Sequence, residues 1–208
     1  MKRLCAMAML VLGSSILVAA QERPLSPPGT ATAMVGGDWM KNADGNTVYQ
    51  GGKWIEVAYS RPMLRQRTNI FGAGADYGVA VRAGTPLWRA GANLTTVLKT
   101  EVAMVFGSST VPAGEYGLLI DLKSPTEWTL VITRQPRQAQ FDANNKTDLI
   151  GAVNYDPKFD VARVPMAVET IELKLDQLTI FFCDVTRTAG KLALAWENTV
   201  ATVEFTVR

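Results

Sequence analysis

Short runs in which apolar and polar residues alternate recur along the chain, and they predict strands. In residues 127–133 (EWTLVIT), Trp128, Leu130 and Ile132 fall on one face of an extended segment. Comparable runs rich in β-branched and aromatic residues lie at 54–60, 95–107, 116–122, 167–175, 177–185, 191–197 and 199–207. The pattern predicts an all-β fold, a single antiparallel β-sandwich (jelly-roll-like or immunoglobulin-like) of about eight to ten strands.

The same pattern predicts how some strands connect. Residues 95–107 form either one long strand or two short ones. The segment 177–185 is apolar on both faces, so we expect it to be central and fully covered. Residues 191–197 and 199–207 are expected to pair as a hairpin, and the polar stretch 136–160 is expected to be the longest irregular connection.

The first twenty residues differ from the rest of the chain. Lys2 and Arg3 precede an apolar stretch that ends in Val18-Ala19-Ala20, and small residues of this kind are typical of a cleavage site. The stretch is too short and wrongly flanked for the alternative, an uncleaved membrane-spanning anchor. We therefore expect an exported protein, periplasmic or secreted, with no transmembrane segment after cleavage.

Cleavage near Gln21 divides the chain into three parts. Residues 1–20 are the predicted signal peptide, and the proline-rich residues 21–29 (QERPLSPPG) are expected to form an extended tether. Residues 30–208 then form a single β-sandwich domain. A chain of this size buries roughly two-thirds of the surface that it exposes when unfolded, which is enough for a stable core.

The composition excludes several classes of function. Lys2 and Arg3 leave with the signal peptide, which reduces the 21 basic residues to 19 and makes them equal to the 19 acidic ones. A neutral chain gives no reason to expect nucleic-acid binding. Histidine is absent, which excludes Ser-His-Asp and Cys-His hydrolysis and histidine-ligated zinc. Cys183 is left without a disulfide partner and is expected to be a small core residue. No cofactor is predicted.

Three arginines gather where the strand at 54–60 ends. Arg61, Arg65 and Arg67 follow Tyr59 within eight positions. Arg61 precedes a proline, which favours extended backbone, and Arg65 and Arg67 share a side if their segment is extended. Guanidinium groups suit carboxylate, phosphate or sulfate, so these residues are candidate ligands for a small anion. The alternative is that they form ion pairs with carboxylates of the protein and hold the loop.

A second candidate site is the segment 88–93 (WRAGAN). Trp88 offers a flat apolar face, Arg89 a planar cation, and Asn93 both a donor and an acceptor, while Gly91 permits close approach of the backbone. This mixture suits a sugar or another small polar ligand. The alternative is that Trp88 packs into the end of the sandwich as a core residue.

Metal binding and carboxylate chemistry receive weaker support. Residues 142–148 (DANNKTD) have the aspartates and asparagines of a calcium loop, but glycine is absent from its sixth position and Val153 stands where a bidentate glutamate is needed. We therefore expect no metal site. Glycoside hydrolysis needs two facing carboxyl groups, and the candidates for such a pair are Glu56, Asp121, Glu127 and Asp184.

Several short motifs, taken in order, resemble one known family. They are YSRP at 59–62, RQR at 65–67, IFG at 70–72, YG at 77–78, WRAGAN at 88–93, PAGEYGLL at 112–119, EWTLVI at 127–132, GAVNYD at 151–156 and LALAWENT at 192–199. The ordered set resembles the secreted bacterial proteins grouped as domain of unknown function 2911, from about Ser26 to the C-terminus. The resemblance implies an exported bacterial β-rich domain and assigns no reaction. Apparent insertions at 38–50 and 137–149 are candidates for an individual specificity.

The sequence as a whole favours a non-enzymatic, exported module that binds a small anionic or carbohydrate ligand. The arginine loop and the segment 88–93 are expected to line one end of the sandwich. Two alternatives stay open: a glycan hydrolase that uses a carboxylate pair, and a purely structural envelope protein. The oligomeric state also stays open.

Overall fold

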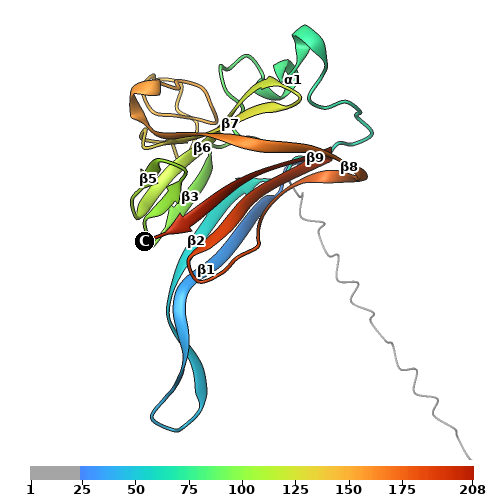
Figure 1. Ribbon diagram of the computed structural model, residues 1–208. Helices are drawn as coiled ribbons and strands as arrows, with labels where there is room; N and C mark the ends of the chain where they lie inside the picture. The colour runs from blue at the N-terminus through green and yellow to red at the C-terminus, as the bar shows by residue number, and fades with distance from the viewer. Residues whose placement is uncertain (1–23) are drawn as a thin grey trace, which may run out of the picture.

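The computed structural model describes residues 24–208, and this part of the chain is mostly antiparallel β-structure (Figure 1). Its nine strands are β1 (Pro28–Lys41), β2 (Thr47–Ser60), β3 (Thr96–Thr100), β4 (Met104–Phe106), β5 (Ser109–Val111), β6 (Gly114–Ser124), β7 (Glu127–Thr133), β8 (Asp160–Cys183) and β9 (Ala189–Val207). One short helix, α1 (Val79–Arg82), and two 3₁₀ turns (Gly74–Asp76 and Pro157–Phe159) complete the elements. The prediction of an all-β, sandwich-like fold is confirmed. The predicted signal peptide lies outside the described residues.

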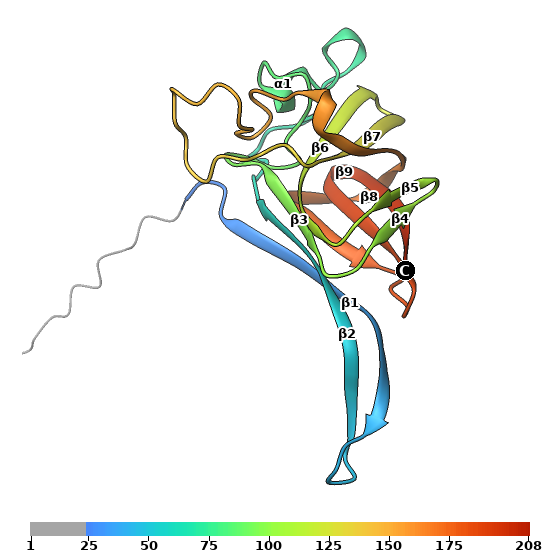
Figure 2. The same cartoon turned by 90° about the vertical axis from the view of Figure 1, so that its left-hand side faces the viewer.

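The first two strands form a long hairpin that projects beyond the sandwich (Figures 1 and 2). Pairing runs from Pro28 opposite Ser60 out to Lys41 opposite Thr47. Residues 38–50, expected to be an inserted loop, are therefore mostly strand, and we call residues 38–50 the arm. The proline-rich segment predicted as a tether contributes its last two residues to β1. Within residues 24–208, no helix is long and apolar enough to span a membrane.

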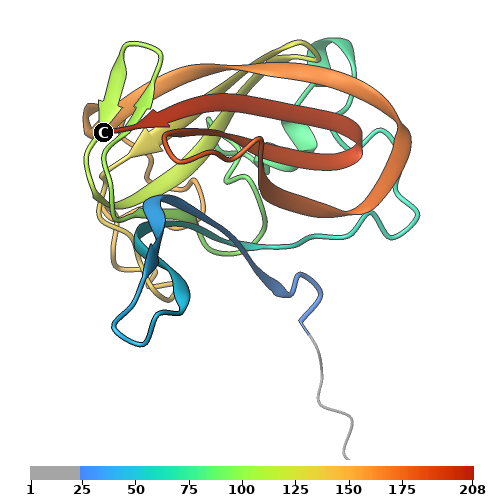
Figure 3. The same ribbon diagram turned by 60° about the horizontal axis from the view of Figure 1, so that its bottom comes forward.

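The strands lie in the order β1-β2-β3-β6-β7-β8-β9-β4-β5. The long strands β8 and β9 bend sharply. Figure 3 shows them as nested curved bands that lead from one layer to the other. The ladder between them shifts register twice between Thr170 and Thr179, where the strands turn the corner. One layer thus contains β1, β2, β3, β6, β7 and the start of β8, and the other contains the rest of β8 with β9, β4 and β5.

The bend corrects two expectations about the C-terminal strands. Residues 191–207 belong to one continuous strand rather than a hairpin, and Glu197 takes a left-handed conformation (φ 55°) at the expected turn. The segment 177–185 is not fully covered: its ladder is formed with β9, and within residues 24–208 its other edge has only a short bridge, from Gln177 to Met63. Phe181, Phe182 and Cys183 are consequently half-buried, so Cys183 is not a core residue.

The core lies between the layers and has an aliphatic part and an aromatic part. Aliphatic side chains that alternate along the strands fill most of it, as Val35, Ile55, Val57 and Leu98 show by their complete burial. One end is instead filled by an aromatic cluster, in which the rings of Phe71, Tyr77, Trp88, Trp128 and Trp196 pack mainly edge to face.

The longest connection between strands is 61–95, and not the predicted 136–160. It covers the aromatic end of the sandwich beside the corner of β8 and β9 (Figure 1). Of the nine non-glycine residues with positive φ among residues 24–208, six lie in it: Arg65, Gln66, Asn69, Ala83, Ala90 and Asn93. Such conformations cost free energy and are often concentrated at functional sites.

Candidate functional site

The connection 61–95 contains a cleft of about 300 Å³ between its two halves. Arg67 comes from the first half and Arg89 and Asn93 from the second, and these three residues supply its polar side chains. The walls are apolar and include Ile70 and Trp196. We call this site the arginine cleft. Residues of both candidate segments thus line one cleft at this end of the sandwich.

Arg67 is held by the turn that it closes. Its Nε donates to the carbonyl of Leu64 at 2.9 Å, and its Nη2 donates to the carbonyl of Met63 at 2.7 Å. The backbone N–H of Arg67 also donates to Leu64, at 3.0 Å. These bonds fix the guanidinium group at the mouth of the cleft, although they supply only partial charges opposite its full positive charge.

Arg89 reaches the cleft from a tightly packed segment. Its Nη1 donates to the carbonyl of Asn93 at 3.0 Å. A side chain at Gly151, whose φ is +62°, would place its Cβ 2.9 Å from that Nη1, so glycine leaves the space that the guanidinium occupies. Burial lowers the pKa of Arg89 from its ordinary value, yet an arginine in a protein stays protonated. A half-buried positive charge therefore faces the cleft.

The arginines of this connection share one electrostatic feature. Within residues 24–208, none of them has a carboxylate oxygen within 4.0 Å: Arg61, Arg65, Arg67, Arg82 and Arg89. Four of them donate instead to backbone carbonyls. The described part of the chain thus lacks the ion pairs on which the structural alternative depends.

Two of the predicted arginines lie away from the cleft. The segment expected to be extended is a turn, in which Arg65 and Gln66 both have positive φ, so Arg65 and Arg67 do not share a side. Arg65 is exposed and donates to the carbonyl of Leu25 at 3.2 Å. Arg61 packs its side chain against Gly29, and its buried Nε has no hydrogen-bond partner among residues 24–208.

The two predicted aromatic ligands, Tyr59 and Trp88, are core residues. Trp88 is 1% exposed; its ring stacks on that of Trp196 at 6.2 Å, and its Nε1 donates to the carbonyl of Gly91 at 3.4 Å. It forms the floor of the cleft and offers no free face for a sugar. The hydroxyl of Tyr59 accepts a hydrogen bond from the backbone N–H of Ile180 at 2.9 Å and so ties the two layers together. Of the candidates, the structure brings together Arg67, Arg89 and Asn93 above Trp88.

A carboxylate that the sequence did not single out holds the cleft wall in place. Glu197 is buried, and it accepts hydrogen bonds from the backbone N–H groups of Asn69 at 2.7 Å and Ile70 at 2.9 Å. The Nζ of Lys174 lies 3.6 Å from Oε1 of Glu197, across the corner of β8 and β9. The one signal available in the sequence is an acidic residue that directly follows the apolar run LALAW. Glu197 positions the wall and does not line the cleft.

The carboxylates proposed for hydrolysis are mostly engaged elsewhere. Asp121 pairs with Arg163 at 3.7 Å, and Glu127 pairs with Lys123 at 3.0 Å. Only Glu56 of the four lacks an ion pair within residues 24–208.

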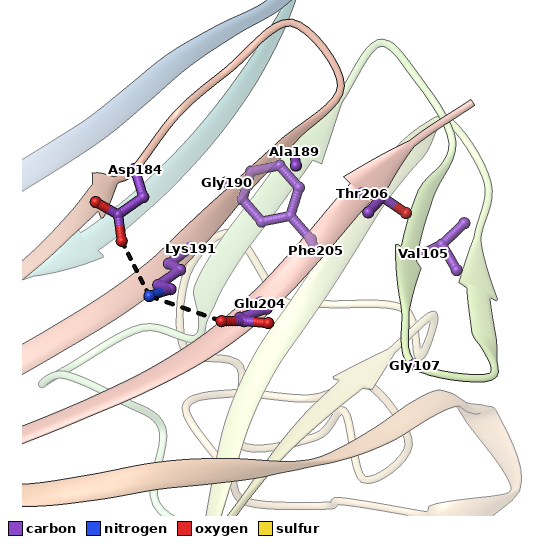
Figure 4. Close-up of a pocket in the computed structure, with 9 residues that line it drawn as sticks. All are labelled: Val105, Gly107, Asp184, Ala189, Gly190, Lys191, Glu204, Phe205 and Thr206. Atoms are coloured by element: carbon purple, nitrogen blue, oxygen red, sulfur yellow. Dashed lines mark ion pairs between the residues drawn. The ribbon is translucent and has the colours of Figure 1, made fainter.

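The fourth, Asp184, lies in a hollow of about 400 Å³ near the C-terminus. Figure 4 shows its carboxylate beside the ammonium of Lys191, at 3.0 Å, with Glu204 on the other side at 3.6 Å. Asp184 first, and Glu204 to a smaller extent, raise the pKa of Lys191, which favours the protonated amine. The charged groups of this hollow therefore pair with one another, with two carboxylates sharing one ammonium.

The asparagine-rich segment 142–148 uses its polar groups internally. The side-chain oxygen of Asn145 accepts hydrogen bonds from the backbone N–H groups of Thr147 and Asp148, and that of Asp142 accepts from Asn144. In the described part of the chain, no group of three or more histidine, cysteine, aspartate or glutamate side chains could hold a metal ion. The segment is thus a set of turns built by its own side chains.

Comparison with known proteins identifies a family but no activity. Neither the curated proteins nor the solved structures contain a match to this chain. The family described as "Protein of unknown function (DUF2911)" matches residues 42–205, which include β2 to β8, all of β9 but its last two residues, and both halves of the arginine cleft. The prediction made from the ordered motifs is confirmed, and the chain belongs to the DUF2911 family.

Proposed function

We propose that the protein is an exported, non-enzymatic binding module whose arginine cleft takes a small anion, such as a uronic acid, a di- or tricarboxylate, or phosphate. One observation carries the proposal: Arg67 and Arg89 face one cleft, and no carboxylate among residues 24–208 neutralises either of them. A bound anion would supply the missing negative charge.

The donors that remain support an oxyanion ligand. A guanidinium group has five N–H donors in a rigid fork. Arg89 uses one of them and Arg67 uses two in hydrogen bonds to the described backbone. The remaining donors can bind carboxylate or phosphate oxygens, in pairs where the geometry allows. At an effective dielectric constant of 20, opposite unit charges 4 Å apart attract each other by about 4 kcal/mol before the cost of desolvation is subtracted, so the two guanidinium groups attract an anion to the cleft.

The lining favours binding over catalysis. Of the residues that line the cleft, none is a carboxylate, a hydroxyl, a thiol or an amine, so the described residues supply neither a nucleophile nor an acid–base pair. The apolar wall from Ile70 and Trp196 suits the carbon skeleton of a small organic anion. Export is proposed from the pattern of residues 1–20, and mass spectrometry of the mature N-terminus tests it.

Thermal melting in the presence of anions tests the proposed ligand class. Citrate, glucuronate, sulfate and phosphate are compared with glucose and with sodium chloride at matched ionic strength. A specific ligand at a hundredfold excess over its dissociation constant stabilises the folded state by about 2.7 kcal/mol. At least one anion should raise the melting temperature of the parent, and chloride and glucose should not.

Two arginine variants locate the effect. Arg89→Gln should lose most of the stabilisation, because it removes the half-buried charge. Arg134→Gln is the matched control: this arginine is exposed, lies outside the cleft and forms no ion pair within residues 24–208. If no anion stabilises the parent, or if both variants respond as the parent does, the proposal is wrong.

A further inference from the structure

The outer face of the first layer carries a second hollow, about 390 Å³ in volume, over β1, β2 and β3. Its lining consists of Thr32, Trp54, Glu56, Lys99 and Glu101. The alternation of β2 explains their position: Ile55 and Val57 point into the core, so the residues between and beside them point outward. Figure 2 shows these strands at the root of the projecting hairpin.

Cross-strand pairing brings the side chains of this hollow together. Glu56 lies directly opposite Thr32 on one side and opposite Lys99 on the other. Beside this row, the backbone N–H of Trp54 donates to Oε2 of Glu101 at 2.9 Å, and the backbone N–H of Glu101 donates to the carbonyl of Trp54 at 2.9 Å. This reciprocal pair fixes a carboxylate next to an indole ring.

Trp54 differs from the tryptophans of the core. Trp54 is 47% exposed, whereas Trp88, Trp128 and Trp196 are almost fully buried. Exposing a large aromatic ring on a rigid strand forgoes the free energy of burying it. An exposed indole beside polar groups is suited to a ligand that has one apolar face and hydroxyl groups at its edges.

The charges of the hollow restrict the ligand further. Within residues 24–208, Glu56, Lys99 and Glu101 form no ion pair closer than 4.0 Å, so their polar atoms retain capacity for a ligand. Two carboxylates against one ammonium give the lining a net negative charge. An anionic ligand is disfavoured here, and an uncharged or amine-bearing ligand is favoured.

We propose that this hollow binds a pyranose sugar, either uncharged or carrying an amine, with one face of the ring stacked on Trp54. Glu56 and Glu101 accept hydrogen bonds from its hydroxyl or amino groups, and Lys99 donates to its oxygens. The site is distinct from the arginine cleft and has the opposite charge preference. It would allow the module to hold a glycan and an anion independently.

Nuclear magnetic resonance of the five tryptophan indole N–H groups tests this directly. The mature protein is titrated with glucose, N-acetylglucosamine, glucosamine and glucuronic acid. The Trp54 signal should shift saturably with at least one of the first three sugars, and glucuronic acid should bind more weakly than glucosamine. Absence of any saturable shift of this signal, or tighter binding of glucuronic acid, would overturn the proposal.

Trp54→Ala should weaken sugar binding at least about tenfold. Binding by this variant is followed through the indole signals of the remaining tryptophans. Trp39→Ala is the matched control, because Trp39 is also exposed but lies on the arm outside this hollow. Equal binding by the parent and Trp54→Ala would contradict the assignment. Arg89→Gln should leave sugar binding unchanged while it loses most of the stabilisation by anions, so the two proposals can fail separately.

Discussion

Arg89 and Trp88 are adjacent in sequence, yet their side chains have opposite relations to the folded state. Trp88 is surrounded by the rings of Phe71, Trp128 and Trp196, whereas Arg89 carries a half-buried charge with one described hydrogen bond. The Trp88 side chain stabilises the fold. Replacing Arg89 should change the free energy of unfolding little unless a ligand is bound.

The free energies of unfolding of two variants should therefore diverge. Trp88→Ala is expected to lose about 3–5 kcal/mol, as large aromatic truncations in cores do. Arg89→Gln should stay within about 0.5 kcal/mol of the parent or rise slightly, because it removes an unpaired charge. Urea unfolding measures both. A loss of several kcal/mol in Arg89→Gln would assign this arginine to stability and not to a ligand.

A second prediction at this scale concerns Tyr155 in alkaline solution. Its hydroxyl donates to Asp160 at 2.6 Å and accepts from Arg163 at 2.6 Å. Burial, with the Asp160 carboxylate, raises the pKa of Tyr155 to about 12. The folded state thus keeps a proton that the unfolded chain releases near pH 10, so the stabilisation is complete below pH 10 and is lost as the pH rises toward 12.

The comparison with Tyr155→Phe isolates this effect from other alkaline titrations. The advantage of the parent in melting temperature should be constant from pH 7 to 9 and should shrink between pH 10 and 12. An advantage that stays constant or grows over that range would show that the phenol does not titrate as described.

Among the elements, the arm stands apart from the sandwich. Its outer part pairs only with itself, through Trp39 opposite Tyr49, Met40 opposite Val48 and Lys41 opposite Thr47. Its root is held by the ion pair of Asp38 with Arg187 at 2.7 Å. An isolated two-stranded ribbon contributes little stability of its own.

Shortening the arm should therefore leave the sandwich intact. Replacing residues 39–49 with Asn-Gly, a pair that favours a two-residue hairpin turn, keeps Asp38 and Gln50 as neighbours across the ribbon. Urea unfolding should give a free energy within about 0.5 kcal/mol of the parent. Ile55→Ala, in the buried part of β2, is the contrasting variant and should lose about 2–5 kcal/mol. A shortened variant as unstable as Ile55→Ala would show that the arm supports the core.

The elements differ in how far the sequence could predict them. β7 was predicted with its bounds, because its alternation is undisturbed. β1 was missed, because prolines precede it and Gly36 and Gly37 interrupt its pattern, so that it depends on pairing with β2. The turn expected after Trp196 is a bend at the corner of the sandwich, which a local pattern cannot distinguish from a hairpin.

The candidate site could be predicted only in part for a similar reason. The spacing of the arginines shows that they cluster in the sequence, and we expected both candidate segments to line one end of the sandwich. Which arginines converge is decided by tertiary contacts: the turn at 65–66 directs Arg65 away, and Glu197, distant in sequence, holds the wall beside Arg67. The exposure of Trp54 has no signal in the sequence, because a tryptophan in a strand is more often buried than exposed.

For the whole molecule, folding should not depend on a metal ion. The described residues hold no suitable ligand group, and the turns of 142–148 satisfy their own polar atoms. Chelation with EDTA should leave the melting temperature unchanged. A large drop with EDTA that calcium reverses would show that these residues bind an ion after all.

The charge distribution of the whole molecule also favours the proposed ligand class. Arg61, Arg65, Arg67, Arg82 and Arg89 lie within one connection that has a single acidic residue, Asp76, between its first and last arginine. Outside this connection, residues 24–208 carry 17 acidic against 13 basic residues, so the positive charge is concentrated at this end of the sandwich and forms a local field that attracts anions.

Calorimetric titration of citrate and of phosphate tests this claim most directly, with the parent, Arg89→Gln and Arg134→Gln measured side by side. We predict saturable 1:1 binding of at least one of the two anions by the parent and by Arg134→Gln, and binding at least about tenfold weaker by Arg89→Gln. Absence of binding to the parent, or equal affinity in Arg89→Gln, would contradict the assignment of the arginine cleft as an anion site.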